Sequence, residues 1–194
     1  MMYRIPVNDW ADFAVMFCRT NFRPFFRWFS GYIEGFVGSL EALLAFIPVL
    51  LFIIIIALLA WRFSGRGLAL FAIVGSLLIL SMGLWEQTML TVALILTATF
   101  ISLLIGIPLG ILASRSEPAW KILRPILDIM QTMPIFVYLL PALMLFGIGL
   151  APAVIATVVF ASPPAIRLTN LGIRQVPQEV MEAALAFGST PMQI

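Results

Sequence analysis

The segment LGIRQVPQEVMEAALAFGSTPMQI, residues 171–194, returns polar side chains to a chain that is otherwise almost entirely apolar. Pro177 suits the first position of a helix, where its missing N–H costs nothing. Glu182 follows in an early turn, where a carboxylate stabilises the helix dipole. Gly188 predicts a left-handed stop, and Pro191 predicts the start of a further helix. The segment therefore predicts a short helix, a sharp turn and a new helix.

The composition of the whole chain indicates a membrane protein. Hydrophobic residues make up 62% of the 194 residues and charged residues 10%, whereas a soluble domain has about 25% charged residues. So much apolar surface cannot be buried in one soluble core. The net charge of +2 is too small to predict nucleic-acid binding. The absence of histidine and the single cysteine, Cys18, exclude imidazole catalysis, an internal disulfide and the usual metal sites.

Five apolar runs are each expected to cross the bilayer, because about 20 helical residues span its hydrocarbon core. These spans are residues 42–61, 68–85, 89–113, 126–146 and 153–168. Pro163 and Pro164 predict a break near the end of the last span. Gly106, Gly110 and Ser114 share one helix face, which predicts close helix packing. The expected fold class is an all-α polytopic membrane protein.

Residues 1–41 predict amphipathic helices that lie in the membrane interface, because aromatic side chains recur there at helical spacing with arginines between them. These aromatic residues include Trp10, Phe13, Phe17, Phe22, Phe25, Phe26 and Phe29. Pro24 is expected to separate two such helices. The tail has no compact apolar run with a cleavage site, so it is not a signal peptide.

The basic residues predict the orientation of the spans. With residues 171–194 in the cytoplasm, the loop cations all lie inside, which is the positive-inside pattern. These cations are Arg62, Arg66, Arg115, Lys121, Arg124, Arg167 and Arg174. Five spans then place the N-terminal tail, residues 1–41, outside the cytoplasm. The competing topology has a pair of cytoplasmic surface helices in that tail and one span fewer or more.

Polar side chains and a proline interrupt the fourth span and form the candidate translocation pathway. They are Gln131, Thr132, Pro134 and Tyr138. Polarity and a helix break at membrane depth tend to line a cavity, although hydrogen bonding and packing between helices explain each residue taken alone. Tyr138 could also present an aromatic face to an ammonium group. Asp128 is expected at the cytoplasmic interface beside Arg124 rather than in a proton relay.

Eight motifs carry a family resemblance, and the most telling is the EAALAFG of residues 182–188. The others are LIGIPLG (104–110), RPILD (124–128), MQTMP (130–134), FVYL (136–139), LFGIG (145–149), PPAIRLT (163–169) and QVP (175–177). In combination they resemble the glycine betaine/proline osmoprotectant permeases of ATP-binding-cassette importers, over roughly residues 104–194. The first hundred residues match that family only in layout. Further spans follow the EAA loop in that family, and the last helix here would be too short to hold itself, so we expect a C-terminally truncated chain.

The resemblance implies the transmembrane-domain fold of a type I importer, incomplete here, in the bacterial inner membrane. It implies a permease homodimer, two ATPase subunits that hold ATP and magnesium, and an extracytoplasmic substrate-binding protein or domain. The implied solute is glycine betaine, proline, choline or a similar compound. The implied ATPase contact is Glu182, Ala183, Ala184 and Gly188, and ATPase closure would drive alternating access through it. The permease itself would carry no catalytic residue, metal or cofactor.

Other functions are less consistent with the residues. A secondary transporter would need membrane-buried carboxylates, and four of the five spans carry no acid between their ends. A membrane enzyme would need a nucleophile–base pair or a metal site, and none is visible. A non-transporting scaffold, or a permease for another small polar solute such as an amino acid, stays open. On its motif alone, the segment 171–194 favours an amphipathic helix at the membrane surface, and the rest of the chain reverses that preference. Glu182 could meet a basic residue of the ATPase or cap its own loop.

Overall fold

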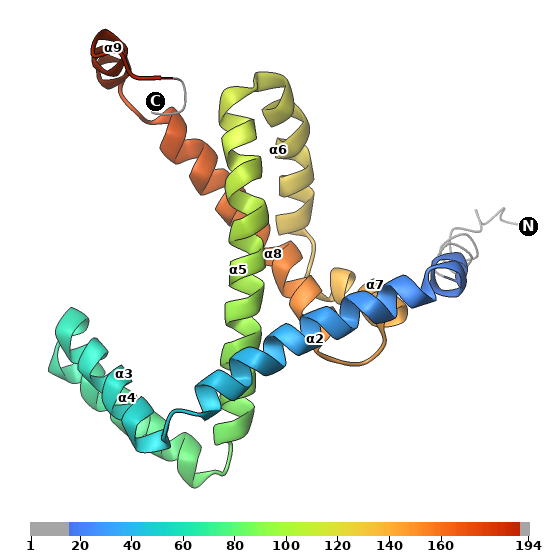
Figure 1. The fold of residues 1–194 in the computed structure, drawn as a ribbon, viewed down its shortest axis with the longest axis vertical. Helices are drawn as coiled ribbons and strands as arrows, with labels where there is room; N and C mark the ends of the chain where they lie inside the picture. Colours follow the sequence, from blue (N-terminus) through green and yellow to red (C-terminus); the bar gives the residue numbers. More distant parts are fainter. Residues whose placement is uncertain (1–15, 191–194) are drawn as a thin grey trace, which may run out of the picture. The chain divides into compact units, whose positions relative to one another are not determined.

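The structure of the protein, a computed structural model, describes residues 16–190. The aromatic residues predicted before Met16 and the further helix predicted at Pro191 lie outside the described residues. The described residues form α-helices joined by short turns (Figure 1). The helices are α2 (Arg23–Ala45), α3 (Val49–Ser64), α4 (Arg66–Ser81), α5 (Trp85–Arg115), α6 (Glu117–Thr132), α7 (Phe136–Phe146), α8 (Leu150–Arg174) and α9 (Gln178–Ala186). The all-α prediction is confirmed for this part of the chain.

Two helices, α5 and α8, are long and apolar enough to cross a membrane. Two pairs of helices joined by a short break would each qualify if the pair counts as one span: α2 with α3, and α6 with α7. The described residues then contain up to four spans. The 16-residue α4 is a shorter apolar helix. These criteria rest on length and composition, so the five-span layout and the side of the tail stay predictions.

The helix boundaries follow turn-forming residues. Gly65, with φ 92°, ends α3 and precedes α4, so Arg62 lies in the last turn of one helix and Arg66 begins the next. Glycine tolerates this left-handed conformation because it has no Cβ. Pro24 lies in the first turn of α2, after a separate helical stretch at residues 16–21, so the predicted boundary between two helices is confirmed there.

The break predicted at Pro163 and Pro164 is wrong, because α8 runs through both residues without interruption. Each proline removes one backbone hydrogen bond, but the 25-residue helix keeps its bonds on both sides of the pair. Pro163 is also fully buried, so packing holds the backbone in place. Pro108 likewise lies inside the continuous helix α5.

The chain divides into two compact units, and α5 and α8 each contribute to both. The first unit contains the described residues up to Ala98 together with Leu139–Ile155. In it, Phe146 of α7 packs edge-on against Phe26 of α2, with ring centroids 4.9 Å apart. Phe52 of α3 meets Trp85 of α5 at 5.6 Å. Aromatic contacts of this kind join the first unit's helices.

The second unit contains Thr99–Tyr138 together with the described residues from Ala156 onward. Its centre is a close contact between α5 and α8. A Cβ added to Gly106 would lie 2.6 Å from the Cβ of Ala165, and one added to Gly110 would lie 2.5 Å from the Cβ of Thr169. The predicted packing face is therefore confirmed for both glycines.

Candidate functional site

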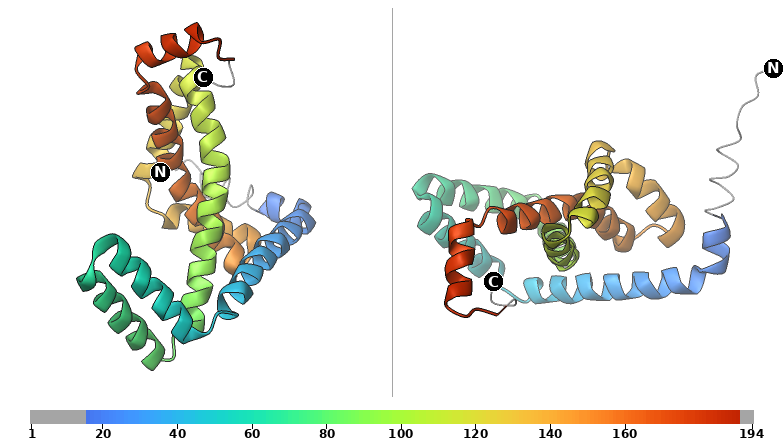
Figure 2. Two further views of the ribbon diagram at one scale, coloured as in Figure 1. Left: turned by 60° about the vertical axis from the view of Figure 1, so that its left-hand side comes forward. Right: turned by 90° about the horizontal axis from the view of Figure 1, so that it is seen from above.

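The predicted docking helix is α9, nine residues that follow a turn after α8 (Figure 2). Pro177 is the N-cap with φ −60° and ψ 140°, one position earlier than predicted, and Glu179 lies in the first turn. Glu182 accepts a hydrogen bond of 2.9 Å from the side-chain amide of Gln178 one turn earlier. One oxygen of the Glu182 carboxylate is therefore already bonded within α9.

A hydrogen-bonded stop ends α9 as the sequence predicts. Gly188 has φ +80°, and its N–H donates to the carbonyl of Leu185 at 3.0 Å. The N–H of Ser189 donates to the carbonyl of Ala184, also at 3.0 Å. This pair of bonds is a Schellman motif, which satisfies the last helical carbonyls and reverses the chain. The left-handed residue must be glycine or bear strain.

Apolar side chains of α9 remain exposed within the described part of the chain. No residue of α9 is buried against the other described residues. Val180 and Leu185 are exposed, and Phe187 at its C-cap is 91% exposed. Ala183 is exposed and Ala184 half-buried, so the small side chains that the sequence singled out leave the helix backbone accessible. Such an apolar, low-profile helix is suited to a groove on a partner.

Arg174, the last residue of α8, anchors the base of this loop to two other helices. Its guanidinium donates to the backbone carbonyl of Ala113 at 3.0 Å, near the end of α5. It also forms an ion pair with Glu117 in the first turn of α6. A third bond, 2.9 Å long, runs to the side-chain oxygen of Asn170, which is buried. The cation thus satisfies an orphan carbonyl where the α5 dipole is negative.

A second ion pair joins α8 to α6 seven residues earlier. Arg167 donates to Asp128 at 2.5 Å. Asp128 lies one turn after Arg124 on α6, as predicted, and its ion-pair partner is Arg167 of α8, which the sequence did not indicate. Both pairs are partly exposed, so each contributes about 0–1 kcal/mol alone. Together, the two ion pairs join α8 to α6 at two positions along both helices.

The predicted pathway residues gather at the break between α6 and α7. α6 ends at Thr132 and α7 begins at Phe136, so the helix break expected from Pro134 is present. Gln131, Thr132 and Pro134 are exposed. The hydroxyl of Tyr138 donates to the carbonyl of Met130 at 2.6 Å, across this break. Tyr138 therefore holds the break together, and a pathway role for these residues stays a prediction.

Comparison with known proteins identifies the family. Residues 106–194 match the family described as binding-protein-dependent transport system inner membrane component. The chain is 49% identical to the glycine betaine transport system permease protein OpuAB of Bacillus subtilis, over 98% of this chain and 67% of that protein. It is 44% identical to the glycine betaine/carnitine transport permease protein GbuB of Listeria monocytogenes, over 97% and 68%. It is 45% identical to the glycine betaine/proline betaine permease protein ProW of Escherichia coli, over 98% and 54%.

The chain belongs to this family of inner-membrane transport permeases. It is a non-catalytic, membrane-embedded component of a binding-protein-dependent transport system. The permease spans about two thirds of the Bacillus and Listeria relatives and 54% of the Escherichia relative. The resemblance that the motifs indicated is confirmed, and so is the localisation in the inner membrane.

Sequence reasoning missed the anchoring cluster of the permease. Arg174 was predicted only to be a loop cation, and no role was predicted for Asn170 or Glu117. One local signal was available, since Asn170 and Arg174 lie four residues apart on one helix face. The bond to Ala113 joins residues 61 positions apart, and no periodicity in the sequence predicts it.

Proposed function

We propose that this chain is the membrane-spanning permease subunit of an ATP-driven importer for glycine betaine or a closely similar quaternary ammonium solute. The family and the names of its relatives support this solute class. The observation that carries the mechanism is α9, an exposed apolar helix with a glycine stop, which follows a helix anchored by Arg174. The segment fits the role of a docking element for an ATPase subunit in the cytoplasm.

In this mechanism, α9 receives a movement from the ATPase and passes it to the bundle. The hydrogen bonds and ion pair of Arg174 would make the end of α8, the end of α5 and the start of α6 move as one body. The small side chains of Ala183 and Ala184 would let α9 sit deep in the ATPase groove. The turn at residues 175–177 sets α9 across the end of α8 (Figure 2), and Gly188 would permit the turn that follows α9. Alternating access of the solute site would follow from ATP binding and hydrolysis on the partner.

The remaining partners follow from the same proposal. A second copy of the permease would complete the pathway on a twofold axis, and an extracytoplasmic binding protein or domain would deliver the solute. ATP and magnesium would bind to the ATPase subunit. Gln131, Thr132, Pro134 and Tyr138 are the proposed pathway residues, because they break a helix inside an apolar segment.

Substituting the glycine stop tests the docking assignment. Gly188→Trp forces a bulky residue into a left-handed conformation and onto the α9 surface, so capture of the ATPase by the tagged permease should fall at least tenfold. Gly172→Trp is the matched control, since neither glycine has an atom within 4 Å of an added Cβ but only Gly188 has a positive φ. Unchanged capture by Gly188→Trp would refute docking through α9.

Solute uptake separates the proposed importer from its alternatives. Proteoliposomes with the complete transporter should accumulate labelled glycine betaine when ATP is inside, and Gly188→Trp should abolish this uptake. Uptake of an amino acid instead of glycine betaine would contradict the solute class. ATPase capture without uptake of any solute would favour a scaffold.

A further inference from the structure

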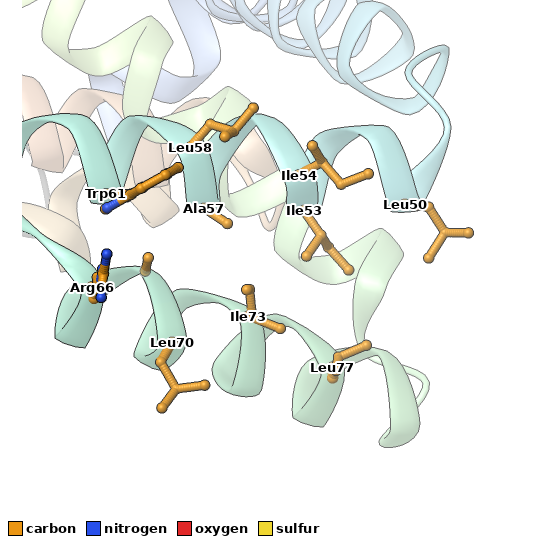
Figure 3. Close-up of a pocket in the computed structure, with 11 residues that line it drawn as sticks. Leu50, Ile53, Ile54, Ala57, Leu58, Trp61, Arg66, Leu70, Ile73 and Leu77 are labelled. Carbon is orange, nitrogen blue, oxygen red and sulfur yellow. The ribbon is translucent and has the colours of Figure 1, made fainter.

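An open apolar groove lies between α3 and α4, far in sequence from the docking loop. The two helices run side by side (Figures 1 and 2), and the groove between them has a volume of about 840 Å³. Leucine, isoleucine and alanine side chains of both helices line it, and Figure 3 shows them along its length. Only Arg66, at one end beside Trp61, supplies a charge to the lining.

The length of the groove along α3 matches the thickness of the hydrocarbon layer of one membrane leaflet. It extends along α3 from Leu50 to Trp61, and these eleven residue steps correspond to about 16 Å of helix. Half of the hydrocarbon core of a bilayer is about 15 Å. A hydrocarbon chain can therefore follow the groove from the membrane surface to the bilayer centre. A polar solute would lose its hydration there without gaining a hydrogen-bonding partner.

The charged end of the groove is suited to an anion. Arg62 and Arg66 lie on either side of the Gly65 turn, and neither α3 nor α4 contains an acidic residue. Within residues 16–190, neither arginine has an acidic side chain within ion-pair distance. The positive-inside pattern predicts that this turn lies at the cytoplasmic surface, where the membrane carries anionic lipids. Trp61 is suited to the same interfacial level.

We propose that the groove between α3 and α4 binds one anionic phospholipid of the inner leaflet. Its phosphate lies at Arg62 and Arg66, and one acyl chain follows the apolar side chains toward Leu50 and Leu77. Basic pockets between membrane helices on the cytoplasmic side bind lipid headgroups in this way. The lipid would stabilise two short helices that otherwise leave apolar surface unfilled between them.

Lipid retention by the purified full chain tests the proposal. The chain in a non-ionic detergent is mixed with dioleoyl-phosphatidylglycerol, and bound lipid is counted by native mass spectrometry. Dioleoyl-phosphatidylcholine, which has the same acyl chains, should be retained much less. Replacing Arg62 or Arg66 by glutamine should weaken phosphatidylglycerol binding about fivefold each, since a cation near an anionic membrane surface contributes about 1 kcal/mol. Arg62→Lys with Arg66→Lys should retain binding.

Matched variants locate the lipid. Ala69→Trp fills the groove one turn from Arg66 and should abolish retention, whereas Val74→Trp, on α4 but outside the groove lining, should not. Arg124→Gln, an exposed cation elsewhere, should leave binding unchanged. Circular dichroism checks that each variant keeps its helical content.

Several results would overturn the proposal. One is equal retention of phosphatidylcholine, and another is retention that survives either Ala69→Trp or the double glutamine variant. Displacement of the lipid by glycerol phosphate alone would indicate an anion site without a role for the groove. A dimer mass lost only in Ala69→Trp, without bound lipid in the parent, would assign the groove to a second copy of the chain.

Discussion

Gly110 occupies a point on α5 where no side chain fits. An added Cβ would lie 2.5 Å from the Cβ of Thr169 and 2.8 Å from the carbonyl oxygen of Ile166, and the latter is backbone that cannot rotate away. We predict that Gly110→Val forces α5 and α8 apart and costs about 1–3 kcal/mol or more, the range for overpacking. The measurement is the thermal unfolding of the permease in detergent. Gly75→Ala on α4, where an added Cβ meets nothing within 4 Å, should be neutral or slightly stabilising.

At this scale, the sequence predicts what depends on local spacing. Gly106 and Gly110 were predicted to face another helix because small residues four apart share a face. For Ser114, which is half-buried and whose hydroxyl donates to Ile111 of its own helix, close packing against another helix stays a prediction. The partner of Asp128 was not predictable in the same way, because Arg167 lies 39 residues away and only the fold brings the two together.

Arg174 of α8 bonds to residues of α5 and α6, and a second prediction concerns the contribution of these bonds to stability. Arg174→Gln removes three contacts at once and leaves the buried oxygen of Asn170 and the Ala113 carbonyl unpaired. An unpaired buried acceptor costs about 1–3 kcal/mol, so the unfolding temperature should fall clearly. Glu117→Gln removes only a partly exposed ion pair and should cost about 0–1 kcal/mol. Equal effects of the two substitutions would contradict the anchor.

The same element provides a functional prediction. If Arg174 transmits the movement of α9, Arg174→Gln should reduce the solute imported per ATP hydrolysed more than it reduces ATPase capture. A merely stabilising contact would lower both in proportion to the amount of folded protein. The measurement is the ratio of uptake to hydrolysis in proteoliposomes, with Glu117→Gln as the milder comparison.

Helix ends were predictable where the chain carries a residue that only an end tolerates. Gly188 adopts the left-handed conformation, and the segment around Pro134 leaves the helix, as the sequence indicates. Pro163 and Pro164 show the limit of this reasoning. A proline removes one backbone hydrogen bond, but whether a helix ends there depends on the packing around the proline. That packing involves residues distant in the sequence, so local spacing does not predict it.

For the whole molecule, the predicted orientation in the membrane depends on the positive charges of the loops. Composition predicted a helical membrane protein, and the motifs predicted its family. The number of spans depends on whether helices on either side of a short break, such as α2 and α3, act as one crossing. Length and hydropathy cannot decide this, because α3 and α4 have only 16 residues each and a single span needs about 20.

Labelling of Cys18 tests the topology, since Cys18 is the single cysteine of the chain and is partly accessible. If the N-terminal tail lies outside the cytoplasm, a thiol reagent that cannot cross the membrane should label Cys18 in intact cells as well as in opened cells. Two controls on a Cys18→Ser background calibrate the sides: Ser64→Cys at the end of α3 should react only after the cells are opened, and Gln87→Cys at the start of α5 should react in both. Labelling of Cys18 only in opened cells, with both controls behaving as stated, would place the tail in the cytoplasm. The chain would then have an even number of crossings between the tail and α9, because the loop charges predict a cytoplasmic α9 in either case.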